Sequence, residues 1–262
     1  MLLVFDVGNT NIFFGLFQGE RLVDTFRLTS KTERTADELG LLLIELLETV
    51  EIKSEDINGI IVSSVVPSIT NLLEKTFAKY FKAEAIFIGP GVKTGINIRT
   101  DNPKEVGADR IVNVAAAHEI YKRSCIVVDF GTATTFDYIS TDGVFKYTII
   151  MPGLNLAAKA LFTGTAKLPD VEIKKPESIL ASNTVSGMQA GIVYGYIGAV
   201  KYTLQEQCKA LHDNPLIIAT GGISEEFIMQ IPEIDVFDPN LALEGMKIIY
   251  KKTKGIIGDL ES

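Results

Sequence analysis

Residues that can bind a phosphate gather in one short turn near the start of the chain. The turn Asp6–Asn11 (DVGNTN) stands between the apolar runs Leu2–Phe5 and Ile12–Phe17, and this pattern is typical of a β-hairpin. Gly8 lets the backbone approach a phosphate, and the groups beside it can donate hydrogen bonds to the phosphate oxygens. Asp6 can hold the hydrated Mg²⁺ that accompanies nucleotide phosphates. An ordinary tight hairpin, with Asp and Asn chosen for the turn, explains this stretch equally well.

The plan of this hairpin recurs in the second half of the chain. The apolar run Ile126–Val128 leads into Asp129, and Gly131 follows Asp129 at the spacing at which Gly8 follows Asp6. Small hydroxyl residues and a second β-rich run come next. Repetition over 123 residues indicates a duplicated domain rather than a solenoid, whose repeats are far shorter. The two turns are expected to face each other across a cleft.

Composition and charge exclude several classes of protein. The 262 residues are 47% hydrophobic and 22% charged, which is typical of a globular protein with an ample core. A net charge of −8 argues against nucleic acid as a partner, because phosphate backbones select basic surfaces. We find no membrane span and no signal peptide. Cys125 and Cys208 are expected to be free thiols, and His118 and His212 lack the spacing of metal ligands.

The order of predicted elements divides the chain into halves 1–122 and 123–262. Each half begins with a three-strand meander, and a helix predicted over 241–252 closes the second half. The buried strand IIVSS at 60–64 corresponds to LIIAT at 216–220, at an offset of 156 rather than 123. This difference predicts an insertion of about 30 residues at about 154–182. Such insertions commonly carry substrate specificity or oligomer contacts.

A long helix is predicted from Thr184 to about Leu211, with Asn183 as its cap. Glycines share one face of it: Gly187, Gly191, Gly195 and Gly198. Each costs roughly 1 kcal/mol relative to alanine. Close approach of another backbone, from the sheet or from a second subunit, is expected to compensate for this cost.

Further candidate residues lie in the loops between the elements. Gly89–Gly95 contains a lysine but fits neither a Walker loop nor G-x-G-x-x-G, and we interpret it as a loop near a ligand. Asp109 and Arg110 stand near the start of a predicted helix, either as a surface pair or as groups that face a substrate. Gly221-Gly222 suits the ribose or adenine side of a nucleotide, although a plain tight turn fits it as well.

Several segments together match one enzyme family in order and spacing. They are Asp6–Thr10, Lys93–Gly95, Glu105–Arg110, Asp129–Thr135, Thr165–Pro169 and Asn183-Thr184. With these segments the chain resembles the type III pantothenate kinases, members of the acetate/sugar kinase, heat-shock ATPase and actin superfamily. The resemblance implies an α/β fold of duplicated ribonuclease H-like (actin-like ATPase) domains with a nucleotide cleft between them.

The resemblance also implies an activity, which is ATP-dependent phosphorylation of pantothenate to 4'-phosphopantothenate, the first step of coenzyme A biosynthesis. The ATP phosphates and their Mg²⁺ would be bound by Asp6, Val7, Gly8, Asn9, Thr10, Asn11, Ile12 and Phe13, and Thr132 would contact ATP. Asp6 would bind the Mg²⁺ that the ATP phosphates carry.

The substrate and the second cation have their own implied residues. Pantothenate would be bound by Gly107, Ala108, Asp109, Arg110 and Thr184. Asp109 would accept the proton of the primary hydroxyl, and Arg110 would pair with the carboxylate. Asp129 would hold the K⁺ or NH₄⁺ that the family requires. The family is cytoplasmic and homodimeric, and the second subunit completes its substrate pocket.

One departure from the family pattern lies before Pro152-Gly153. Tyr147-Thr148 stand where the family usually has two glycines, and this bulk is expected to narrow the cleft or to shift the third strand. Two other functions remain open. One is another small-molecule kinase of the superfamily, and the other is a nucleotide-bound accessory or regulatory protein without turnover.

Overall fold

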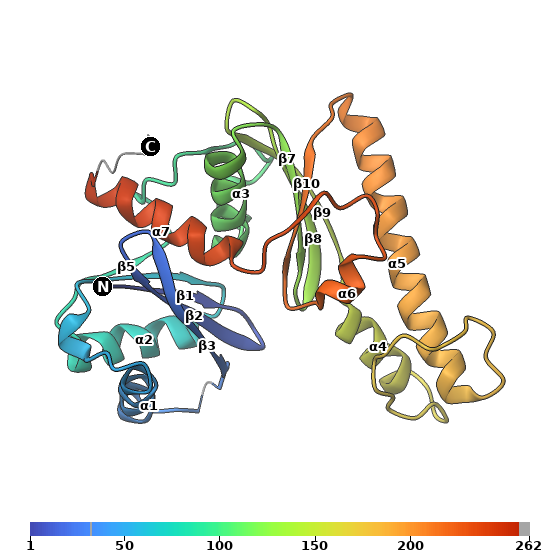
Figure 1. Cartoon of the computed structure of the whole chain (residues 1–262), viewed down its shortest axis with the longest axis horizontal. Helices are drawn as coiled ribbons and strands as arrows, with labels where there is room; N and C mark the ends of the chain where they lie inside the picture. Colours follow the sequence, from blue (N-terminus) through green and yellow to red (C-terminus); the bar gives the residue numbers. More distant parts are fainter. Residues whose placement is uncertain (32, 257–262) are drawn as a thin grey trace. The chain divides into compact units, whose positions relative to one another are not determined.

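The computed structural model describes residues 1–31 and 33–256, and these fall into two compact units (Figure 1). The first unit comprises Met1–Tyr121 together with the chain from Asn240 onward, and the second comprises Lys122–Pro239. The predicted division at 122 therefore differs by one residue from the observed one. The predicted second half included the closing helix, whereas this helix lies with the first unit.

A mixed sheet forms the centre of the first unit. Its strands lie in the order β3 (Arg21–Thr29), β2 (Asn11–Gln18), β1 (Leu2–Val7), β4 (Gly59–Ser64) and β5 (Ala85–Phe87). The strands β1, β2 and β3 are antiparallel neighbours, which confirms the predicted meander, while β4 runs parallel to β1. The short strand β6 (Asn97–Ile98) and the 3₁₀ turns Ser54–Asp56 and Pro103–Glu105 lie in the connections.

Helices cover both faces of this sheet (Figure 1). The helices α1 (Ala36–Glu48) and α2 (Pro67–Tyr80) cover the face on which Phe5, Phe14 and Phe77 form part of the core. The helices α3 (Ala108–Tyr121) and α7 (Leu241–Lys254) cover the opposite face, in a layer with Val4 and Ile61. Burial on both faces explains why β1 and β4 read as nearly continuous apolar runs.

The closing helix α7 joins the first unit through close packing and through a buried lysine. A Cβ at Gly245 would lie 2.5 Å from the backbone oxygen of Val112 in α3, so only glycine fits there. Lys247 is 5% exposed, and its Nζ donates a hydrogen bond to the Glu20 carbonyl at 3.1 Å and lies 4.7 Å from the centre of the Phe17 ring. These contacts tie the end of the chain to its first hairpin.

The second unit repeats the sheet plan. Its strands lie in the order β11 (Val236–Phe237), β10 (Leu216–Gly221), β7 (Cys125–Phe130), β8 (Ala133–Ile139) and β9 (Val144–Pro152). The meander of β7, β8 and β9 was predicted and is confirmed. Burial raises the pKa of the Cys125 thiol to about 12, so this thiol stays neutral. Both cysteines are free, as predicted.

The long helix α5 (Thr184–Leu211) packs its buried side against this second sheet, with Val193, Tyr196 and Val200 in the core. Asn183 caps the helix as predicted, because its side chain accepts a hydrogen bond from the Ser186 backbone N–H at 3.0 Å. The predicted insertion contains α4 (Leu154–Thr163) and an extended segment, and α6 (Glu225–Ile228) follows β10.

The strand register corrects one detail of the predicted duplication. Asp6 on β1 pairs with Ser63 on β4, and Asp129 on β7 pairs with Thr220 on β10. Ser63 and Thr220 therefore correspond, at an offset of 157 rather than 156. Because side chains alternate between the faces of a strand, the one-residue difference exchanges the two faces.

We expect Gly245→Ala to destabilise the protein by about 1–3 kcal/mol, because the added methyl group overlaps backbone that cannot move freely. Urea unfolding followed by circular dichroism measures this change. Gly89→Ala is the matched control, since a Cβ there meets no atom of the described residues within 4 Å, and we expect a change within about 0.5 kcal/mol. An unchanged urea midpoint for Gly245→Ala would contradict the close packing of α3 and α7.

Candidate active site

The turn between β1 and β2 presents backbone and small polar side chains to solvent. The Gly8 N–H donates to the Asn11 carbonyl at 3.0 Å, and Asn9 and Thr10 are exposed. Val7 and Ile12 flank the turn with 1% and 2% exposure, because their side chains belong to the core. Of the residues predicted to bind phosphate, these two can therefore contribute only backbone groups.

A serine that was not among the predicted site residues holds this turn in place. Ser30 follows β3, and its hydroxyl donates to the Gly8 carbonyl at 2.6 Å. Its backbone N–H donates to the Thr10 carbonyl at 2.9 Å. The two bonds fix the turn from the side of β3. The pairing of Asn11 with Thr29 places Ser30 there, and this register is visible only in the folded sheet.

The predicted substrate residues Gly107–Arg110 form the start of α3. The Asp109 carboxylate accepts a hydrogen bond from the Arg110 backbone N–H at 2.8 Å. A Cβ at Gly107 would lie 2.4 Å from the same carboxylate oxygen, so glycine is required if Asp109 is to keep this position. Ala108 adds little bulk beside it.

The start of α3 and the phosphate turn lie at one edge of the first unit. The Val65 N–H donates to the Val7 carbonyl at 3.1 Å, where β1 and β4 end. A Cβ at Gly107 would lie 3.5 Å from the Val65 side chain. Val65 thus links the strand end that carries Asp6 to the helix start that carries Asp109. The fold brings these two predicted elements together.

The second turn, in the second unit, is held by close backbone contacts. Gly153 donates its N–H to the Thr132 carbonyl at 3.0 Å, and a Cβ at Gly153 would lie 2.3 Å from the Gly131 carbonyl oxygen. Gly221, at the end of β10, has a φ of +101°, and a Cβ there would lie 2.6 Å from a carboxylate oxygen of Asp129. The Asp129 carboxylate thus rests against backbone that has room only for glycine.

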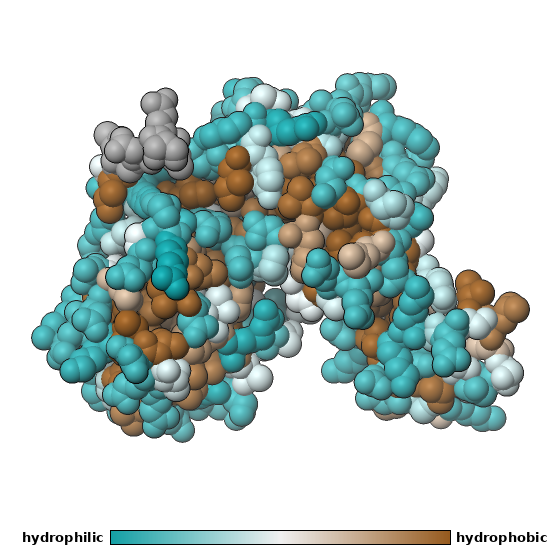
Figure 2. All heavy atoms as spheres, viewed as in Figure 1, coloured by the Kyte–Doolittle hydropathy of each residue, from teal (hydrophilic) through white to brown (hydrophobic). Residues whose placement is uncertain are grey.

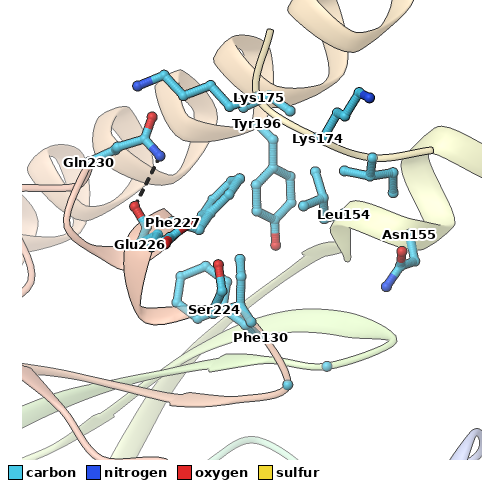
Figure 3. Close-up of a pocket in the computed structure, with 15 residues that line it drawn as sticks. Phe130, Leu154, Asn155, Lys174, Lys175, Tyr196, Ser224, Glu226, Phe227 and Gln230 are labelled. Carbon is cyan, nitrogen blue, oxygen red and sulfur yellow. Dashed lines mark hydrogen bonds between the residues drawn. The ribbon is translucent and has the colours of Figure 1, made fainter. Parts of the chain in front are cut away.

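A pocket of about 380 Å³ opens beside this turn (Figure 3). Its wall includes Gly222 and Ser224 after β10, and the Phe227 and Tyr196 rings meet edge to face at 5.9 Å. The Tyr196 hydroxyl shares a hydrogen bond with Thr134, which fixes the ring. In Figure 3, Lys174 and Lys175 lie along the opposite rim.

The remaining predicted residues are exposed. Thr132 lies at the tip of the β7–β8 turn, and Thr184 is the first residue of α5. Tyr147, part of the departure from the family pattern, is 57% exposed and stacks on Tyr138. It pairs with Tyr138 while Pro152 pairs with Ala133, so it lies about 16 Å along β9 from the Gly131 turn. Its bulk does not crowd that turn.

The acidic residues suit a metal that arrives with phosphates. In the described residues, no group of three or more His, Cys, Asp or Glu side chains is arranged to hold a metal ion. Mg²⁺ is commonly bound through one or two carboxylates and substrate phosphates, and it keeps several waters. The single carboxylate of Asp6, beside a turn of exposed polar groups, fits that manner of binding.

Comparison with known proteins agrees with this arrangement. A family model described as type III pantothenate kinase matches residues 2–206. A type III pantothenate kinase from Syntrophus aciditrophicus (strain SB) is 50% identical over 252 residues, which cover 96% of this chain and 99% of the relative.

Solved structures share the fold at low sequence identity. The ethanolamine utilization protein EutJ from Carboxydothermus hydrogenoformans matches with a TM-score of 0.55 and 16% identity, over 94% of this chain and 89% of that one. Component A of (R)-2-hydroxyglutaryl-CoA dehydratase from Acidaminococcus fermentans matches with a TM-score of 0.55 and 14% identity, over 97% and 98% of the two chains.

The repeated sheets and their paired acidic turns define a protein of the duplicated ribonuclease H-like, actin-like ATPase fold. Within that class the chain belongs to the type III pantothenate kinase family. Its activity is the ATP-dependent phosphorylation of pantothenate, the first step of coenzyme A biosynthesis, and it uses ATP with a divalent metal. In the part of the chain that the structure describes, no helix is long and apolar enough to cross a membrane.

Proposed function

We propose that Asp109 is the general base of this reaction and that the Asp6–Phe13 turn holds the ATP phosphates. The observation that carries the proposal is the placement of both elements at one edge of the first unit, linked by Val65. The pantothenate hydroxyl oxygen attacks the γ-phosphorus, the bond from that phosphorus to ADP breaks, and Asp109 receives the hydroxyl proton. Positioning and charge neutralisation supply most of the catalysis in such transfers.

Several features support the binding of the phosphates at this turn. The exposed groups of Asn9 and Thr10 can donate to phosphate oxygens, and Ser30 binds the carbonyls of Gly8 and Thr10. Mg²⁺, when bound, neutralises charge on the phosphates, and Asp6 would hold it through its waters. Thr132 would contact ATP from the β7–β8 turn.

The nucleoside end of ATP has a candidate pocket in the second unit. The pocket beside Gly222 combines aromatic and aliphatic side chains with polar and charged ones, among them Lys174, Lys175 and Glu226 (Figure 3). Ligand pockets commonly use such polar groups to orient the ligand. Its size suits a nucleoside. The predicted role of Gly221-Gly222 at the ribose or adenine side is supported by the position of Gly222 in the pocket wall.

Pantothenate would be bound by Gly107–Arg110 and Thr184. Arg110 follows Asp109 at the start of α3, where the helix dipole favours an anion. A guanidinium there can bind the pantothenate carboxylate in a bidentate manner. The hydroxyl end would then face Asp109, one residue away along the helix.

Asp129 would hold the monovalent cation, K⁺ or NH₄⁺. Its carboxylate rests at the end of β7 against Gly221, and the carbonyl groups of the neighbouring turn supply the kind of oxygen that binds such cations.

We also propose a cytoplasmic homodimer. The glycines of α5 are exposed, and a Cβ at Gly191, Gly195 or Gly198 would meet no atom of the described residues within 4 Å.

Apolar side chains also reach the surface near the start of α5. Leu180 is 86% exposed and Val185 is 45% exposed, and brown apolar atoms are visible on this side of the second unit (Figure 2). A second copy would cover both this surface and the glycine face. Close packing would then offset the cost of the helix glycines in helix stability, which is roughly 1 kcal/mol each.

We expect Asp109→Asn to lower kcat by about 10²–10⁴-fold, because the side chain keeps its shape but loses its basicity. ATP binding, measured by calorimetry, should survive. Arg110→Ala should instead raise the KM for pantothenate, since the carboxylate loses its partner. Near wild-type turnover of Asp109→Asn would rule out the base assignment. Turnover of another alcohol with no activity on pantothenate would point to another kinase of the superfamily, and ATP binding without any turnover would point to the accessory role.

We expect turnover to depend on K⁺ or NH₄⁺, and Asp129→Ala to abolish this dependence together with most activity. Gly221→Ala should raise the K⁺ concentration needed for half-maximal rate, because a methyl group displaces the Asp129 carboxylate. Initial rates in sodium buffer with added potassium measure both effects. Full turnover in sodium alone, unchanged by potassium, would argue against the cation site.

Light scattering should give twice the chain mass of 28.6 kDa for the wild type at micromolar concentration. Gly195→Leu should give the single chain mass, because a large side chain on the glycine face prevents close approach. Lys75→Leu, an exposed change on α2, is the control and should remain dimeric. A monomeric, fully active wild type would remove the dimer from the proposal.

A further inference from the structure

A buried hydroxyl lies on the strand next to Asp6. Ser63 is on β4, 0% of it is exposed, and its Oγ has no hydrogen-bond partner among the residues that the structure describes. An unsatisfied buried hydroxyl costs free energy, and alanine would fit the same space without that cost. A native protein that keeps such a group usually has a reason for it.

The strand register points to the reason. Asp6 and Ser63 are direct partners across the parallel pair of β1 and β4, so their side chains project from the same face. Direct partners on one face lie close enough for their side chains to interact. The face is the one that Val4 and Ile61 share with α3. Ser63 is thus placed beneath the carboxylate that the proposed function assigns to the hydrated Mg²⁺.

The second unit repeats this pair independently. Asp129 on β7 is the direct partner of Thr220 on β10, and Thr220 is 3% exposed. Each half of the duplication therefore places a buried hydroxyl residue beside the acid at the end of its central strand. Two halves that otherwise differ in their turn residues and in an insertion share this feature.

We propose that Ser63 is a positioning residue for Asp6, and that Thr220 has the same role for Asp129. When the Asp6 carboxylate turns toward bound Mg²⁺ and phosphates, the Ser63 hydroxyl donates a hydrogen bond to its rear oxygen. This bond holds the other oxygen toward the waters of the metal. Groups that orient the ligands of a metal in this way commonly change its affinity by about 10–100-fold when they are removed. The proposal rests on the role of Asp6 in the proposed function.

Ser63→Ala tests the proposal with a readout that does not need turnover. Calorimetry measures ATP affinity with and without Mg²⁺, and thermal unfolding of the same samples measures stability. We expect the Mg²⁺-dependent part of ATP affinity to fall about 10–100-fold, while the unfolding temperature is unchanged or raised. Ser63→Thr, which adopts the residue of the other half, should retain the wild-type Mg²⁺ dependence.

Ser64→Ala is the matched control. Ser64 lies one residue further along β4, and its Oγ bonds Thr70 at 2.8 Å and the Val66 N–H at 3.2 Å. Its loss should lower the unfolding temperature and leave the Mg²⁺ dependence unchanged, which is the opposite pattern. If Ser63→Ala does not fold, Ser63→Cys keeps the size with a weaker donor and should show the same loss in smaller degree.

Asp6→Asn separates the two levels of the argument. If Asp6→Asn lowers Mg²⁺-dependent affinity but Ser63→Ala does not, the positioning role is wrong and the role of Asp6 stands. If Asp6→Asn has no effect, the proposed role of Asp6 fails and the role of Ser63 fails with it. A fall in kcat for Ser63→Ala at unchanged Mg²⁺ dependence would assign the hydroxyl to Asp109 and overturn the proposal. In the double variant, the Ser63 change should add nothing to the Asp6 change.

Discussion

In both units the candidate site depends on a glycine beside a carboxylate, because any side chain at that position would overlap the carboxylate. A Cβ at Gly107 would lie 2.4 Å from the Asp109 carboxylate, and a Cβ at Gly221 would lie 2.6 Å from that of Asp129. Real Cβ atoms do not approach other atoms so closely, so any larger residue would move the acid. The glycines therefore allow the Asp109 and Asp129 carboxylates to keep their positions, and a ligand attracted by either carboxylate must bind at that position.

The packing of the first unit gives Asp6 and Asp109 a well-packed base. The strand β1 is covered on both faces, by α1 and α2 on one and by α3 and α7 on the other. Its end therefore has little freedom to move relative to the start of α3. The contact of Gly245 with α3 and the contacts of the buried Lys247 with Glu20 and Phe17 hold α7 in this base. A residue near position 245 thus supports a turn at position 6.

The sequence predicted the elements whose signals are local. Both meanders, the cap of α5 and the repeated acid turns follow from alternation, turn residues and capping residues, and all are found. The unit to which α7 belongs could not be predicted, because an amphipathic helix shows that it packs but not against which sheet. The role of Ser30 and the offset of 157 could not be predicted for a related reason, since both depend on the register between paired strands.

The two halves place an acid on the same strand frame but surround it differently. In the first unit Ser30 holds the turn through a side chain and leaves Asn9 and Thr10 exposed as donors. In the second unit Gly153 donates its backbone N–H to the Thr132 carbonyl, and the carbonyl groups of Gly131 and Thr132 lie close against it. Donors suit an anion such as phosphate, and carbonyl oxygens suit a cation. Under the proposed roles, the duplicated strands place the acid in each half, and the turn residues beside it decide whether the site accepts an anion or a cation.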